Sequence, residues 1–107
     1  MIRHFAIAGA VVLALGASAE AQQPRTSTVE SGVYLEFGAS FVDYQNIESA
    51  ERCRDLCLQD RRCRIWRYVS GTAPADYGRA RRVCVLGERA PQSRTTPGGW
   101  ATSGQVQ

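Results

Sequence analysis

The stretch ERCRDLCLQDRRCRIWRYVS, residues 51–70, contains three of the four cysteines of this 107-residue chain. The fourth cysteine, Cys84, follows in RRVCVLGE. Cysteines at this density bind a metal, carry out redox chemistry or form disulfides, and the surrounding sequence distinguishes these cases.

The first half of this stretch predicts an amphipathic helix. Ser49 is a suitable N-cap, and Glu51 lies in the first turn, where the helix dipole favours an acid. Cys53 and Cys57 recur at i and i+4 and therefore share one face. We expect the helix to end near Asp60.

The second half predicts a strand. Residues 63–70 alternate with period two, so Trp66 and Tyr68 face one side, towards the helix, and Arg67 faces the other. A loop rich in turn residues follows, and residues 82–88 return as the second strand of an antiparallel hairpin.

Two flanking segments extend this sheet. Residues 32–47 predict two short strands or one bent strand, and residues 99–104 predict a last short strand, whereas residues 89–99 read as loop. The predicted fold class is α+β, a small antiparallel sheet packed around one helix.

The spacing of the cysteines predicts two disulfides. Cys53 and Cys57 point the same way from the helix, so each should reach the sheet. Five residues separate Cys57 from Cys63, which is enough for the chain to leave the helix and start the strand, so these two cysteines can bond to each other. Cys53 is then left to bond to Cys84. The chain-entropy model gives about 2.4 kcal/mol for the short loop and about 3.7 kcal/mol for the long one.

C-x2-C zinc knuckles and a C-x-x-C redox pair are both absent, so we expect no metal and no cofactor.

The N-terminus predicts export. Arg3, the apolar run at 5–17 and small residues with A-x-A spacing are typical of a secretory signal peptide, residues 1–21. The apolar run is shorter than the roughly 20 residues of a membrane-spanning helix, so no membrane span is expected after cleavage. We expect a flexible leader at 22–31, a domain at 32–104, a tail at 105–107, and a periplasmic or secreted location.

The composition argues against catalysis. The single histidine, His4, lies in the signal peptide, and the chain has no lysine, so histidine-dependent triads and lysine nucleophiles are excluded. The acids are scattered singly and suggest no acid–base pair. We therefore predict a protein that is not an enzyme. The exclusive use of arginine, with abundant alanine and glycine, suggests a GC-rich bacterial genome.

Residues 43–69, DYQNIESAERCRDLCLQDRRCRIWRYV, followed by CVLGE and a terminal GWATSG, resemble a PAN/apple domain, in particular the small bacterial single-domain members. The matching positions are Asp43–Tyr44, Cys53, Cys57, Asp60, Cys63, Trp66, Tyr68, Cys84, Leu86 and Ser103–Gly104. The resemblance covers residues 32–104 and implies a sheet that embraces one helix, with two bridges between them. It also implies binding to proteins or carbohydrates. The third bridge of the apple domains in blood proteins is missing, so their partner preferences are not transferred here.

Two groups of residues are candidates for ligand contact. If the predicted hairpin pairs closely, we expect its arginines to approach one another and form a patch that suits sulfate, phosphate or carboxylate groups; they are Arg64, Arg67, Arg81 and Arg82. A solvated face neutralised by nearby acids is the alternative. Tyr77 and Trp100 lie in glycine-flanked segments and suit stacking on a sugar ring, with end-of-domain packing as the alternative.

Together these observations predict an exported, disulfide-stabilised, non-catalytic module that binds a protein or a glycan, an anionic polysaccharide among the candidates. Nucleic acid is not an expected partner, because the chain is exported. The alternatives are a structural accessory protein of the cell envelope and a small carboxylate hydrolase.

Overall fold

A computed structural model describes residues 24–107. The predicted signal peptide and the first two residues of the predicted leader lie outside the described residues. The elements are strands β1 (Glu30–Ser31), β2 (Tyr34–Glu36) and β3 (Ser40–Tyr44), helix α2 (Ala50–Gln59), strand β4 (Ile65–Val69), the 3₁₀-helix η1 (Ala75–Tyr77), and strands β5 (Val83–Gly87), β6 (Ser93–Thr95) and β7 (Ala101–Gln105).

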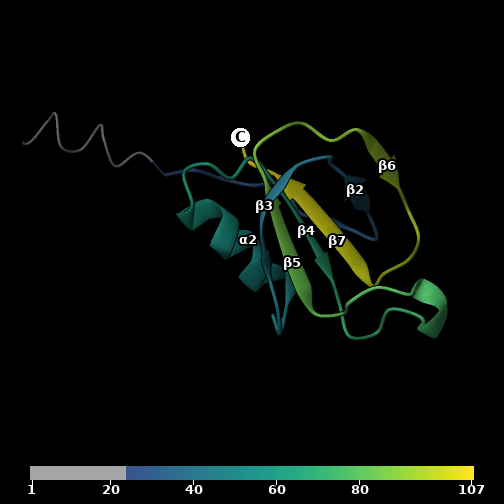
Figure 1. Cartoon of the computed structure of the whole chain (residues 1–107). Helices are drawn as coiled ribbons and strands as arrows, with labels where there is room; N and C mark the ends of the chain where they lie inside the picture. Colours follow the sequence, from purple (N-terminus) through teal and green to yellow (C-terminus); the bar gives the residue numbers. More distant parts are fainter. Residues whose placement is uncertain (1–23) are drawn as a thin grey trace, which may run out of the picture.

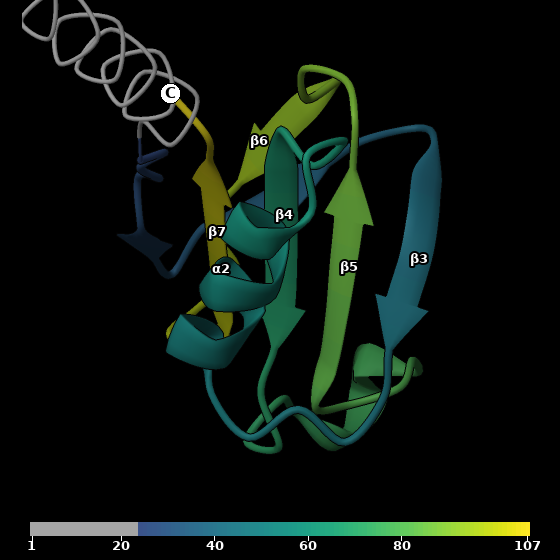
Figure 2. The same ribbon diagram turned by 90° about the vertical axis from the view of Figure 1, so that its left-hand side faces the viewer.

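The chain forms three layers. The central layer is a five-stranded antiparallel sheet in the order β1-β7-β4-β5-β3. Helix α2 crosses one face of this sheet, as Figure 2 shows, and the two-stranded β2–β6 sheet covers the other face (Figure 1). One helix against an antiparallel sheet confirms the predicted α+β class. None of the helices in the described part of the chain has the length and apolarity to cross a membrane.

Helix α2 begins and ends where its sequence predicts. The Ser49 hydroxyl accepts a hydrogen bond of 3.1 Å from the backbone N–H of Arg52, which satisfies a donor that the first turn leaves free. The helix ends at Gln59, and Asp60 leaves it in an extended conformation. Its buried face presents Cys53 and Cys57 to the sheet.

The two predicted disulfides are confirmed. Cys53 bonds to Cys84 and Cys57 bonds to Cys63, with Cα–Cα distances of 5.4 Å and 5.2 Å. All four cysteines are fully buried and pack with Trp66, which is also fully buried, in the core between helix and sheet. The disulfides are therefore the centre of this core.

A second core lies on the other face of the sheet. Ile65 of β4 faces this side, as its alternation with Trp66 predicts, and packs against Leu35 and Phe37 from the β2 segment. Strand β6 closes this layer by pairing with β2, although its residues read as loop from the sequence. All three β6 side chains are exposed, so no apolar alternation marks the strand.

The segment before β2 is part of the fold. Residues 22–31 read as a flexible leader from the sequence, but β1 pairs with β7, and Ser27 forms a bridge to Val106. The Arg25 guanidinium donates to backbone carbonyls at the end of α2, those of Leu58, Asp60 and Cys63. The N-terminal segment contacts backbone atoms of β7 and of the end of α2. Its own polar sequence therefore does not predict these contacts.

Candidate functional site

An open cleft of about 380 Å³ is lined in part by residues of β2 and β6. These strands form the layer on the side of the sheet away from α2 (Figure 1). We call this cleft the aromatic cleft, and its lining residues are Tyr34, Glu36, Tyr77, Arg79, Thr95, Pro97 and Trp100. They come from strands β2 and β6, from the β4–β5 loop that contains η1, and from the turn before β7.

Tyr77 and Trp100 meet in this cleft. Their ring centroids lie 4.7 Å apart with the planes tilted by 59°. Tyr77 ends η1, and Trp100 follows the turn at Gly98, whose φ of 148° suits only glycine. Trp100 is held in place because its carbonyl accepts a hydrogen bond of 2.9 Å from the N–H of Ser70. The structure thus brings together the two aromatic residues that the sequence proposes for stacking.

Tyr34 forms the base of the cleft and was not identified from the sequence. Its side chain is buried, and its hydroxyl accepts hydrogen bonds from the Tyr77 hydroxyl at 3.5 Å and from Arg79 Nη1 at 3.2 Å. Burial and the bond to Tyr34 raise the pKa of Tyr77 to about 12. The Tyr77 phenol is therefore neutral at physiological pH.

The Arg67 guanidinium packs against the ring of Tyr34. Its guanidinium carbon lies 4.5 Å from the centre of the Tyr34 ring and 4.9 Å from that of Phe37. It donates to the Leu35 carbonyl at 2.9 Å and lies 3.9 Å from a Glu36 carboxylate oxygen. Only 12% of the Arg67 side chain is exposed, so its geometry is that of a residue positioning the site.

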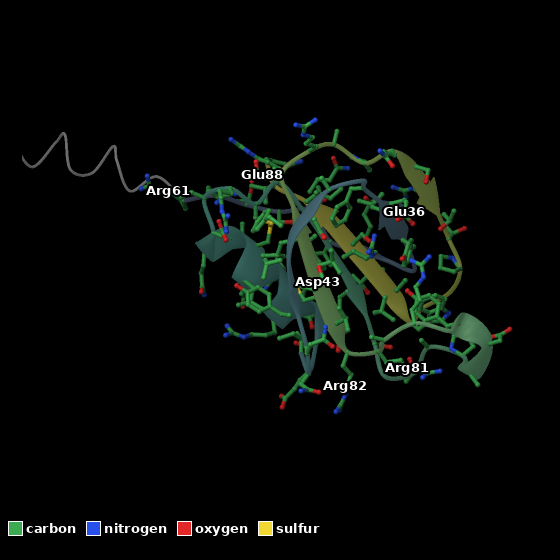
Figure 3. The ribbon with its side chains drawn as sticks, in the orientation of Figure 1. Glu36, Asp43, Arg61, Arg81, Arg82 and Glu88 are labelled. Carbon is green, nitrogen blue, oxygen red and sulfur yellow. A yellow bond between two sulfur atoms is a disulfide. The ribbon has the colours of Figure 1, made fainter. Side chains whose placement is uncertain are left out.

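The four candidate arginines do not form one patch. In the β4–β5 hairpin Ile65 pairs with Gly87 and Val69 pairs with Val83. Arg64 therefore lies at one end of the hairpin, and Arg81 and Arg82 lie at the other. Figure 3 shows Arg81 and Arg82 at the end of the sheet opposite to Glu88. Five strand residues at about 3.3 Å each separate the two ends.

Arg81 and Arg82 line a second hollow, of about 600 Å³, together with Glu48, Tyr68, Ser70, Gly71 and Thr72. Arg81 also donates to the carbonyls of Ala73 at 3.0 Å and Pro74 at 2.8 Å, directly before η1. Arg81 thereby orders the segment that carries Tyr77. Arg82 adopts a positive φ of 60°, and its side chain lies beside Gly71.

Two arginine–acid ion pairs lie at α2: Arg54 with Asp55 within the helix, and Arg62 with Asp60 at its end. The Asp60 carboxylate accepts hydrogen bonds from the side chain and the backbone of Arg62. These bonds lower the pKa of Asp60 from its ordinary value. Within residues 24–107 no three metal-ligating side chains come together.

The comparison with protein families agrees with this architecture. A model of the PAN domain family matches residues 30–86, which is more than half of the chain, so the chain belongs to the PAN domain family. The match includes all four cysteines, Tyr34 and Tyr77, whereas Trp100 lies beyond it. No curated protein matches the chain.

PAN domains are in general non-catalytic modules that bind proteins or carbohydrates. The two disulfides and the family fit a protein outside the cytoplasm.

Proposed function

We propose that this chain is an exported, non-catalytic binding module that holds a protein or a carbohydrate in the aromatic cleft. The observation that carries the proposal is the tilted pair of Tyr77 and Trp100, which lines an open cleft beside the Arg79 guanidinium. Tyrosine, tryptophan and arginine are the side chains that most often dominate binding energy, because they offer large, stiff contact areas and directional donors.

The contents of the cleft support binding without catalysis. Glu36 is the single carboxylate among the described lining residues, and the Arg67 guanidinium lies 3.9 Å from it. A carboxylate hydrolase uses two acids placed on either side of the bond that is cleaved. All four cysteines are joined in disulfides, so none offers a thiolate.

Export is part of the proposal. Residues 1–21 act as a signal peptide, and the mature chain begins at Gln22 and works in the periplasm or outside the cell. Two disulfides support this placement, because they form and persist in oxidising compartments. The mature chain would retain Arg25 and Ser27, which hold the N-terminal segment against α2 and β7.

The hollow at Arg81 and Arg82 is the second candidate for ligand contact. Two arginines beside the hydroxyls of Ser70 and Thr72 suit an anionic group. Arg81 is engaged by the carbonyls of Ala73 and Pro74, which leaves Arg82 as the freer cation. We therefore rank this hollow below the aromatic cleft.

The test uses the oxidised mature chain, residues 22–107, immobilised and exposed to separate polysaccharide and protein fractions of a bacterial envelope. We expect Trp100→Ala to abolish retention of the ligand and Trp100→Phe to preserve part of it. Arg82→Gln serves as the control for the second hollow. If Trp100→Ala retains every partner and Arg82→Gln loses them, the aromatic cleft is not the site. Retention unaffected by either change would favour the structural accessory role.

A further inference from the structure

We infer that the ligand of the aromatic cleft is an oligosaccharide that carries a carboxylate, as a uronic acid does, with one sugar ring on Trp100 and the carboxylate on Arg79. This inference rests on the proposed function, because it names the class of ligand for the same cleft. Four features of the cleft lead to it.

The first feature is the state of Arg79. Its side chain donates to the Tyr34 hydroxyl at 3.2 Å, and the ion pairs of the described residues involve four other arginines. Arg79 is therefore an exposed cation, held by a hydrogen bond to Tyr34, with no carboxylate partner in residues 24–107. A guanidinium has five N–H donors, so the remaining donors can take a carboxylate in the bidentate geometry.

The second feature is the protonated phenol of Tyr77 beside that cation. Tyr77 remains protonated well above physiological pH, because burial and the bond to Tyr34 raise its pKa to about 12. An arriving carboxylate therefore meets no phenolate. The Tyr77 hydroxyl donates its proton to Tyr34, so its oxygen can accept a hydrogen bond from a ligand hydroxyl.

The third feature favours a sugar over a peptide. The lining combines three aromatic residues with a threonine hydroxyl, one carboxylate and one guanidinium, and Pro97 is its single aliphatic residue in the described part of the chain. The C–H face of a sugar ring packs on the electron-rich face of an aromatic ring, while its hydroxyls reach the polar groups around it. A peptide would instead require an apolar pocket for its anchoring side chain.

The fourth feature is a neighbouring hollow that limits the charge of the ligand. This hollow, of about 200 Å³, shares Tyr34, Tyr77 and Arg79 with the aromatic cleft and adds Asp43. Arg79 thus lies where the two hollows meet, with Glu36 lining one and Asp43 lining the other. Glu36 lies on β2 and Asp43 lies on β3, an edge strand of the central sheet (Figure 3). Glu36 and Asp43 accept hydrogen bonds from the hydroxyls of neutral sugars, and they repel any further carboxylate of the ligand. The expected ligand therefore alternates one acidic sugar with neutral sugars.

The test compares oligosaccharides that differ in the carboxylate alone. The oxidised chain 22–107 is titrated by calorimetry with hexasaccharides of hyaluronan and of unsulfated chondroitin, both of which alternate a uronic acid with a neutral sugar. The same hexasaccharides with their carboxyl groups reduced to alcohols are the neutral counterparts, and oligogalacturonate is the fully acidic one. We expect at least one alternating oligosaccharide to bind, with its reduced form and oligogalacturonate about 10- to 100-fold weaker.

Variants identify the cation. We expect Arg79→Gln to lower affinity for the acidic hexasaccharide about 10- to 100-fold and to weaken binding of the reduced form by a smaller factor. Arg89→Gln removes the same charge at an exposed position that does not line the cleft, and should change affinity less than about twofold. Salt should weaken binding by the normal protein and have less effect on Arg79→Gln.

The results separate the inference from the proposed function. Equal binding of acidic and reduced oligosaccharides, no effect of Arg79→Gln, or no binding of any uronic-acid oligosaccharide would overturn the inference. Capture of an envelope protein in place of a glycan would also overturn it. In each case a ligand whose retention Trp100→Ala abolishes would leave the proposed function standing. Ligand retention that is unaffected by Trp100→Ala would instead count against the aromatic cleft itself.

Discussion

The indole N–H of Trp66 donates a hydrogen bond of 2.8 Å to the hydroxyl of Ser27, which precedes it by 39 residues. Trp66 is fully buried between sheet and helix, so this polar group needs a partner inside the protein. Ser27 provides it because the N-terminal segment lies along the end of β7, where Ser27 forms a bridge to Val106. The first described residues therefore complete the core.

Ser27→Ala should lower the free energy of unfolding by about 1–3 kcal/mol, because the Trp66 N–H would be left buried without an acceptor. Urea titration of the oxidised protein, followed by tryptophan fluorescence, measures the change. Thr26→Ala is the matched control, since the Thr26 side chain is exposed. Equal stability of the two variants would show that water replaces the hydroxyl.

The two disulfides should contribute unequally. Replacement of both Cys53 and Cys84 by alanine opens a loop with a sequence separation of 31, and the same change at Cys57 and Cys63 opens one of 6. The chain-entropy model gives losses of about 3.7 and 2.4 kcal/mol. Thermal unfolding of the two double variants tests the order. A larger loss from the short loop would indicate that packing around Cys57 outweighs chain entropy.

Arg67→Met should destabilise the β2 layer, whereas Arg64→Met should not. The Arg67 guanidinium lies against the rings of Tyr34 and Phe37 and donates to the Leu35 carbonyl. Loss of a charge-assisted hydrogen bond and two ring contacts should cost about 2–3 kcal/mol. Arg64 is exposed at the end of the hairpin. Urea titration of both variants compares them, and equal losses would contradict a special role for Arg67.

Stability should fall at high pH through Tyr77. Its pKa is raised to about 12 in the folded protein, above the ordinary value of 10, so the folded state holds the phenolic proton more tightly than the unfolded state. The resulting stability is fully present below pH 10 and is lost as the pH rises towards 12. Rapid urea titrations between these values should show the loss. Tyr77→Phe should weaken the pH dependence, and an unchanged profile would assign it to another group.

The central helix, the hairpin and the disulfides could be predicted because local patterns determine them. The stripe of Cys53 and Cys57, the N-cap at Ser49 and the alternation around Trp66 each specify a conformation within a few residues. The edges of the fold carry no such pattern. Strand β6 and the N-terminal segment pair through backbone atoms with partners far away in the sequence, and their side chains are mostly polar. Leu35 pairs with Arg94, 59 residues later, and Glu30 pairs with Ser103, 73 residues later.

The site was predictable only in part for the same reason. Tyr77 and Trp100 could be singled out as aromatic residues in glycine-flanked loops, but their contact depends on how two distant loops fold together. Tyr34 reads as an ordinary strand residue. The expected patch of Arg64 with Arg81 and Arg82 was wrong, because antiparallel pairing places the start of one hairpin strand opposite the end of the other.

Gly104 and Gly99 offer the sharpest test of the packing at β7. A Cβ atom on Gly104 would lie 2.6 Å from the Trp66 ring and would also collide with the Thr28 carbonyl oxygen. Neither the buried ring nor a paired backbone can move freely, so Gly104→Ala should destabilise the fold by about 1–3 kcal/mol or more.

Gly99→Ala should be neutral, because nothing lies within 4 Å of the added methyl group. Both variants add one methyl group within the same terminal segment, so urea titration compares the two sites directly. If Gly104→Ala unfolds at the same urea concentration as Gly99→Ala, the N-terminal segment does not press against Trp66 in solution. The Ser27–Trp66 hydrogen bond would then be lost with it. A large loss from Gly104→Ala alone would establish that the Ser103–Gly104 motif contains glycine because two segments and a tryptophan ring converge there.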